Sequence, residues 1–150
     1  MNQRVAIVGH LSLVLYGPDG QVKDRREVHN TVTTAGDKIV ADAMSDQGET
    51  PLSHMAVGTG NGQTSASTTL ATESDRNALA STTQGTGGDD NDVIYVATWL
   101  AGDATAALTE AGIFNDASAG DMGFYADFAA INKAAGDTLT ITWTVTFGAS

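Results

Sequence analysis

One ten-residue segment near the end of the chain constrains the fold more than any other. Between residues 138 and 147 threonine occupies every second position, and the positions between hold Leu139, Ile141, Trp143, Val145 and Phe147. Successive side chains of a β-strand point to opposite faces, so this pattern predicts a strand with one buried apolar face and one hydroxyl-bearing face. Such one-sided strands are typical of antiparallel sheets.

Other segments bounded by glycine or turn residues predict further strands, mostly apolar, with a polar partner strand over residues 21–32. We expect them over residues 4–16, 21–32, 55–60, 93–100, 108–114 and 122–128, with a brief helix or strand around 71–79 and a loop tip at 85–91. Gly17-Pro18-Asp19-Gly20 supplies a turn that makes the first two strands a hairpin. The segment 93–100 is apolar at both parities, which predicts a strand covered on both faces.

A single helix is predicted after the hairpin. Thr34 can act as its N-cap, and Asp37 lies in the first turn, where negative charge is favoured. The helix should end at Gln47-Gly48. Its expected apolar stripe consists of Ile39, Val40, Ala43 and Met44.

These elements predict a mainly β protein, an antiparallel β-sandwich of the jelly-roll or immunoglobulin-like kind with one short helix. At 150 residues the chain fits one domain. We expect residues 1–150 to form this single sandwich domain, with a short N-terminal arm over about residues 1–4.

The charge of the chain narrows the choice of partners. Seven basic and 18 acidic residues give a net charge of -11, which argues against nucleic acid as a partner because phosphate binding needs clustered Lys and Arg. No apolar run approaches the length of a membrane span, and His10 and Ser12 interrupt the one that resembles a signal peptide. Residues 1–38 carry a net +1 and residues 77–150 a net -8, which predicts two differently charged surfaces.

No motif with a catalytic or metal-binding mechanism stands out. The three histidines, His10, His29 and His54, are separated by 19 and 25 residues, which matches no ligand spacing on one element. The acidic run 89–92 fails the calcium-loop pattern, because apolar residues stand where a ligand and a glycine belong. The glycine-rich segment 58–64 lacks the lysine of a phosphate loop. We therefore expect no enzyme, no catalytic residue, no cofactor and no metal.

The sequence allows two roles for the aromatic side chains of Tyr95 and Trp99. Trp99 and Tyr95 share one parity of the segment 93–100, while the opposite parity is also apolar. Core packing is one interpretation of these aromatics. The alternative is a subunit interface, where Trp and Tyr are enriched.

Several segments together resemble structural proteins of tailed bacteriophages. They are Val32-Thr33-Thr34-Ala35-Gly36, Met55-Ala56-Val57-Gly58-Thr59-Gly60, Thr109-Glu110-Ala111-Gly112-Ile113-Phe114-Asn115, Ile131-Asn132-Lys133 and the closing strand from Gly136. The similarity spans about residues 8–148 and is greatest to the capsid decoration (cement) proteins, although some relatives are labelled tail-fibre-like.

The resemblance implies a function and partners. It implies a β-sandwich that binds the outer capsid surface as a homotrimer, contacts the major capsid protein and stabilises the shell against internal DNA pressure. The protein would be made in the host cytoplasm and reside in the virion. A tail-fibre or baseplate component is the alternative, and a carbohydrate-binding module is the alternative of another class.

The charge asymmetry adds a hypothesis about contacts. The arm residues Asn2, Gln3 and Arg4 and the hairpin cations Lys23, Arg25 and Arg26 are the candidate capsid-interface residues. Glu110, in the motif that carries the resemblance, is expected to accept hydrogen bonds from backbone N–H groups of a turn.

Overall fold

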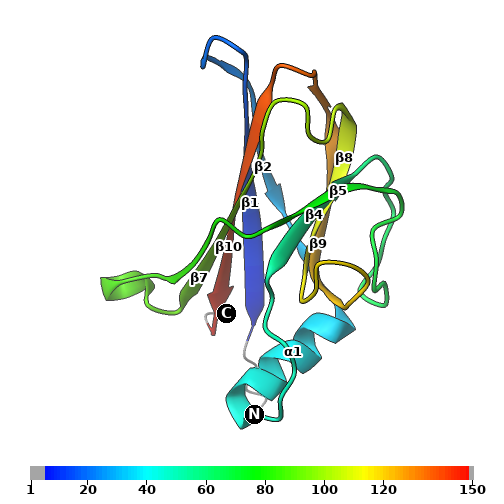
Figure 1. Cartoon of the computed structure of the whole chain (residues 1–150). Coiled ribbons are helices and arrows are strands. Elements are labelled where there is room, and N and C mark those ends of the chain that lie inside the picture. Colours follow the sequence, from blue (N-terminus) through cyan, green and yellow to red (C-terminus); the bar gives the residue numbers. More distant parts are fainter. Residues whose placement is uncertain (1–5, 149–150) are drawn as a thin grey trace.

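Two five-stranded antiparallel sheets pack face to face in the computed structural model, which describes residues 6–148 (Figure 1). Sheet A has the strand order β2-β1-β10-β7-β6, and sheet B has the order β3-β9-β8-β4-β5. The strands are β1 (Ile7–Tyr16), β2 (Val22–His29), β3 (Thr31–Val32), β4 (His54–Gly58), β5 (Glu73–Ala78), β6 (Ser81–Gln84), β7 (Asp92–Trp99), β8 (Ala106–Phe114), β9 (Met122–Lys133) and β10 (Thr138–Phe147). The predicted mainly β sandwich with one helix is confirmed.

The core lies between the two sheets and is built largely by the predicted apolar parities. The central strand β10 buries Leu139, Ile141, Trp143 and Val145 and pairs with β1 and β7 on either side. Trp99 is fully buried in this core, and Tyr95 packs against it, so the core interpretation of these aromatics is correct.

The predicted strand over 21–32 is divided by the structure. β2 ends at His29, and Asn30 takes the chain across to the other sheet, where β3 pairs with β9. Asn30 Oδ1 accepts a hydrogen bond of 3.0 Å from the indole N–H of Trp143. The single strand predicted over residues 21–32 is therefore two strands in different sheets. The hydrogen bond from the Trp143 indole holds Asn30 where the chain crosses between them.

The prediction that the strand over residues 93–100 is covered on both faces was wrong. The strands that are buried on both faces belong to sheet B. The outward side chains of β7, Ile94 and Val96, are only half-buried, whereas β4 is buried at both parities from Met55 to Gly58. The reason is a long irregular segment, residues 59–72, which crosses the outer face of sheet B. A second apolar cluster fills the space beneath it, formed by Ala56, Leu70, Phe114, Met122 and Tyr125.

Helix α1 (Thr34–Ser45) lies across one end of the sandwich, at the opposite end from the β1–β2 turn (Figure 1). Its N-cap is Thr33, one residue earlier than predicted, because the Thr33 hydroxyl accepts a hydrogen bond from the Gly36 N–H. It ends at Ser45 and not at Gln47-Gly48, since Asp46 adopts a left-handed conformation. The predicted apolar stripe is buried only at Ile39, and Met44 is 86% exposed.

Gly36 sets how closely this helix approaches β9. A Cβ atom at this position would lie 2.2 Å from the carbonyl oxygen of Gly123, a backbone atom that cannot easily move. Alanine normally favours a helix over glycine by about 1 kcal/mol. Here the contact reverses that preference.

We therefore expect Gly36→Ala to lower the free energy of unfolding by about 1–3 kcal/mol, because overpacking displaces α1 from the sheet. Urea denaturation of purified protein measures the change. Met44→Ala, at an exposed position of the same helix, is the control and should stay within about 0.5 kcal/mol of wild type. A Gly36→Ala variant more stable than wild type would contradict the packing argument.

Candidate interaction surface

The structure separates the six predicted contact residues into two groups. Asn2, Gln3 and Arg4 lie outside the described residues. Lys23, Arg25 and Arg26 lie on β2, which is an edge strand of sheet A. Long charged side chains suit such a position, because they discourage unwanted strand pairing.

Lys23 is engaged in an ion pair within the protein. Its ammonium lies 2.7 Å from Oδ2 of Asp137, a carboxylate that is 1% exposed. The hydrogen bond from Lys23 holds the pKa of Asp137 below its usual range, and the N–H of Ala134, which donates to the same oxygen, adds to this effect. Lys23 thus joins the hairpin to the turn before β10.

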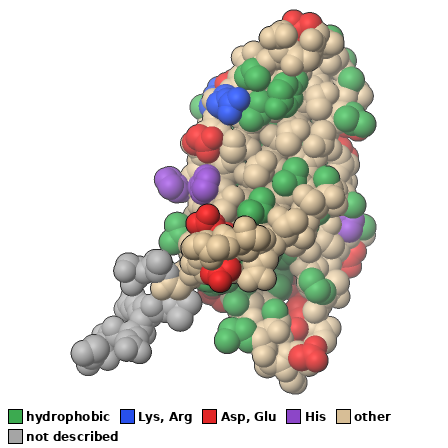
Figure 2. Space-filling model, turned by 90° about the vertical axis from the view of Figure 1, so that its left-hand side faces the viewer, with side chains coloured by type: hydrophobic (Ala, Val, Ile, Leu, Met, Phe, Trp, Pro, Cys, Tyr) green, Lys and Arg blue, Asp and Glu red, His purple; other side chains and the backbone are tan. Residues whose placement is uncertain are grey.

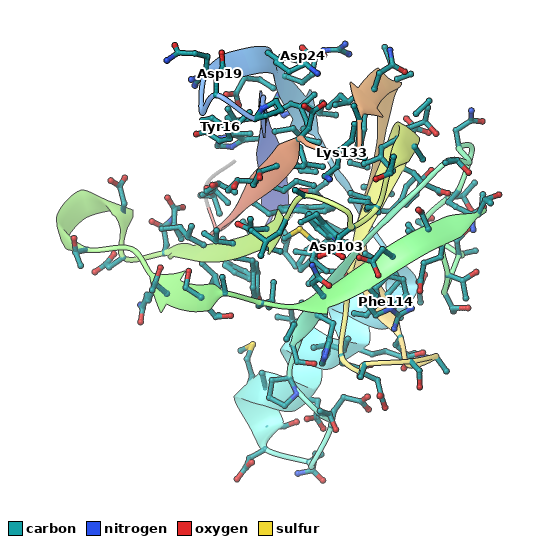
Figure 3. All side chains as sticks on the ribbon, turned by 45° about the horizontal axis from the view of Figure 1, so that its top comes forward. Tyr16, Asp19, Asp24, Asp103, Phe114 and Lys133 are labelled. Atoms are coloured by element: carbon teal, nitrogen blue, oxygen red, sulfur yellow. The ribbon has the colours of Figure 1, made fainter. Side chains whose placement is uncertain are left out.

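A second cation, Lys133, is buried beside this ion pair. Its ammonium donates to the carbonyl of Leu100 at 3.0 Å, and burial lowers the pKa of its side chain. Figure 3 shows this end of the molecule, with Asp19 and Asp24 on the hairpin and Lys133 and Asp103 closer to the centre of the view. Lys133 is therefore part of the interior and is no surface cation.

Arg26 also has a structural role. Its guanidinium binds both carboxylate oxygens of Asp24, at 3.1 and 3.0 Å, and donates to the carbonyls of Ala129 and Ala130 on β9. These bonds link the edge of sheet A to sheet B. Arg26 therefore closes one side of the sandwich, and its guanidinium is already occupied.

Arg25 is the remaining hairpin cation, and it is exposed. It lies opposite Val14 on the outward face of sheet A. Between Gly17 and His29, however, three acidic residues balance the three basic ones. The hairpin edge is thus close to neutral, and the contact of Lys23, Arg25 and Arg26 with a capsid stays a prediction.

The outward face of sheet A offers a different kind of surface. Its three central strands β1, β10 and β7 carry one charged outward side chain, Asp92 at the end of β7, which accepts a hydrogen bond from Thr146. The other outward positions are Val8, His10, Ser12, Val14, Tyr16, Thr138, Thr140, Thr142, Thr144, Thr146, Ile94, Val96 and Thr98. We call these residues the threonine face. Protein interfaces are depleted of charge at their centres, so this face suits a protein partner.

A groove of about 610 Å³ lies between α1 and the adjacent end of the sandwich. Its lining is mostly apolar and includes Val40, Tyr95 and Phe147, with the carboxylates of Asp42 and Asp46 also bordering it. The buried residues of α1 are Gly36 and Ile39, in its first half, and the second half of the helix borders the groove.

Glu110 is fully buried on the outer side of sheet B. Its carboxylate accepts hydrogen bonds from three backbone N–H groups: Gly60 at 2.9 Å, Ala71 at 2.9 Å and Thr72 at 2.8 Å. The expected role of Glu110 as an acceptor for backbone N–H groups is confirmed. These bonds fix both ends of the segment 59–72. The glycine-rich segment 58–64 therefore binds the carboxylate of Glu110 from its own chain.

The described residues contain no group of three or more His, Asp or Glu side chains arranged to hold a metal ion. Their helices include none that is long and apolar enough to cross a membrane. Comparison with protein-family models, curated proteins and solved structures finds no match to this chain. The arrangement of the surface residues is therefore the main guide to function.

The Glu110 bonds predict a large loss of stability on substitution. In Glu110→Gln an amide NH₂ replaces one acceptor oxygen and faces backbone donors, so we expect the free energy of unfolding to fall by about 3 kcal/mol. Hydrogen exchange of the amides of Gly60, Ala71 and Thr72 should accelerate. Glu27→Gln on the exposed edge strand is the matched control and should change neither property. Unchanged exchange at the three amides in Glu110→Gln would contradict the assigned role.

The Lys23–Asp137 pair predicts a pH dependence. Because the folded pKa of Asp137 lies below its unfolded value, its contribution to stability is present above about pH 4 and is lost as pH falls through the folded pKa. Asp137→Asn should lower the urea midpoint at pH 7 and weaken the decline of stability below pH 4. Asp90→Asn, in an exposed loop, should follow the wild-type curve. Parallel acid limbs for Asp137→Asn and wild type would disprove this assignment.

Proposed function

We propose that this chain is a tailed-bacteriophage capsid decoration protein that binds the outer surface of the head lattice as a trimer and stabilises the shell against internal DNA pressure. The observation that carries the proposal is the convergence of two segments of the resemblance on Glu110. Gly58 and Gly60 of one segment surround the carboxylate from the other, and a Cβ atom at either glycine would lie 2.6 or 2.8 Å from its Oε2. Two of the segments that resemble phage proteins thus form one structural unit.

The threonine face is the part of the molecule best suited to contact the major capsid protein. Docking through an uncharged face avoids the cost of removing charges from water. A sandwich whose loops are fixed by buried hydrogen bonds also loses little conformational entropy on binding. Many copies on a closed shell reinforce one another, so each contact needs only modest affinity.

The aromatic side chains give no support to the carbohydrate-binding alternative. Sugar-binding sandwiches present exposed aromatic rings, whereas every aromatic residue of the described chain is buried or half-buried. A tail-fibre or baseplate role differs from decoration in copy number, and the experiment below separates the two.

The proposal predicts high occupancy of the head. Purified protein added to expanded capsids that lack it should bind in hundreds of copies, counted by quantitative gel and seen on the lattice by electron cryo-microscopy. Thr142→Lys, which places a charge at the centre of the threonine face, should abolish binding. Ala107→Lys, at an exposed position of β8 in sheet B, is the matched control and should bind like wild type.

Two results would overturn parts of this proposal. A handful of copies per virion, all at the tail, would replace decoration by the tail alternative. Full occupancy with Thr142→Lys, in a variant that melts like wild type, would exclude the threonine face as the contact.

A further inference from the structure

His10 and His29 face each other across the β1–β2 ladder. The Asn30 N–H donates to the carbonyl of Gly9 at 3.1 Å, which makes His10 and His29 a non-hydrogen-bonded pair of the antiparallel ladder. In such pairs the Cα atoms are about 4.5 Å apart and the side chains approach most closely. The hairpin thus brings together two imidazoles that are 19 residues apart in the sequence.

Both imidazoles are exposed on the outward face of sheet A. Figure 2 shows adjacent histidine side chains at the edge of the molecule, away from the remaining histidine. That third residue, His54, lies on β4 of sheet B, where its Nδ1 is 2.8 Å from the Ser53 hydroxyl. His54 therefore has a local partner and takes no part in the pair.

We propose that His10 and His29 form a binding site for a divalent transition-metal ion such as Zn²⁺, Ni²⁺ or Cu²⁺. Imidazole nitrogen is the commonest protein ligand for these ions. Two imidazoles held by one ladder bind as a chelate, because the backbone pairing has already fixed their separation. The inference rests on this geometry and is independent of the proposed function.

The site is open, since the described chain supplies two ligands and no third His, Asp or Glu completes a cluster. A tetrahedral zinc ion has four positions, so two remain for water or for a group from a neighbouring molecule. Thr144 lies opposite His10 on β10, and Glu27 is two pairs further along the β1–β2 ladder, on the same face and opposite Ser12. The Glu27 carboxylate adds a negative potential that favours a cation at this edge.

Calorimetric titration of the full chain with ZnCl₂ and with NiCl₂ tests the site. We expect one ion per chain, bound by wild type and by His54→Ala alike. His10→Ala and His29→Ala should each lose this binding, because a single exposed imidazole is no chelate. Both side chains are exposed, so the melting temperatures of these variants without metal should match that of wild type.

NMR of the wild-type protein gives an independent measurement that needs no variant. On addition of Zn²⁺ the ring protons of His10 and His29 should shift together, while those of His54 stay in place. Metal binding that survives in the His10→Ala/His29→Ala double variant would overturn the proposal. So would an absence of binding to folded wild-type protein at millimolar metal.

Discussion

The segment 59–72, which covers the outer face of sheet B, depends on the hydrogen bonds that the Glu110 carboxylate accepts. Residues 59–72 contain no regular secondary structure, and without Glu110 the N–H groups of Gly60, Ala71 and Thr72 would lose their acceptors. One buried carboxylate supplies acceptors for Gly60, Ala71 and Thr72, and the hydroxyl of Thr109 donates to the Gly60 carbonyl. Hydrogen bonds to a charged acceptor are about twice as strong as neutral ones, which suits a single anchoring point.

This anchoring makes the two sheets unequal. With the segment 59–72 in place, sheet B is covered on both faces, and Leu70 reaches the apolar cluster on its outer side. Among residues 6–148 no such segment covers sheet A, so within this part of the chain its outward face is left to solvent or to a partner. The threonine face and the histidine pair both belong to this uncovered sheet. The surfaces available for binding are thus a consequence of where the long segment is fixed.

The sequence pattern predicted those elements whose burial follows one local rule. The alternation from Thr138 to Phe147 matches β10 at both ends, because one face is core and the other is not. β6 was missed, since Ser81–Gln84 is exposed at every position and carries no apolar period. β9 extends to Lys133, beyond the predicted end at residue 128. Its second half was missed because buried and exposed side chains alternate only weakly there, and pairing with β8 holds it as a strand.

The same distinction applies to the functional residues: roles set by local sequence were predictable, and roles set by pairing between distant segments were not. The role of Glu110 as an acceptor was predictable, because a carboxylate beside a turn can satisfy backbone N–H groups that otherwise lack partners. The hydrogen bonds from Arg26 to the β9 carbonyls were not predictable, since they join residues more than 100 positions apart. The histidine pair was missed for a related reason. Sequence separation reports ligand spacing within one element, whereas the register of a hairpin decides which residues face each other across it.

Charge illustrates how far a linear pattern can differ from a surface. The first 38 residues carry a net +1, yet two of the three hairpin cations, Lys23 and Arg26, are bound to carboxylates, one of which comes from the far end of the chain. Folding neutralises the predicted basic edge and leaves a face defined by the near absence of charge. A partner that docks there must match its shape, because β-branched side chains on a rigid sheet have few alternative conformations. The threonine side chains at the centre of this face therefore favour a contact of fixed geometry with a partner surface of complementary shape.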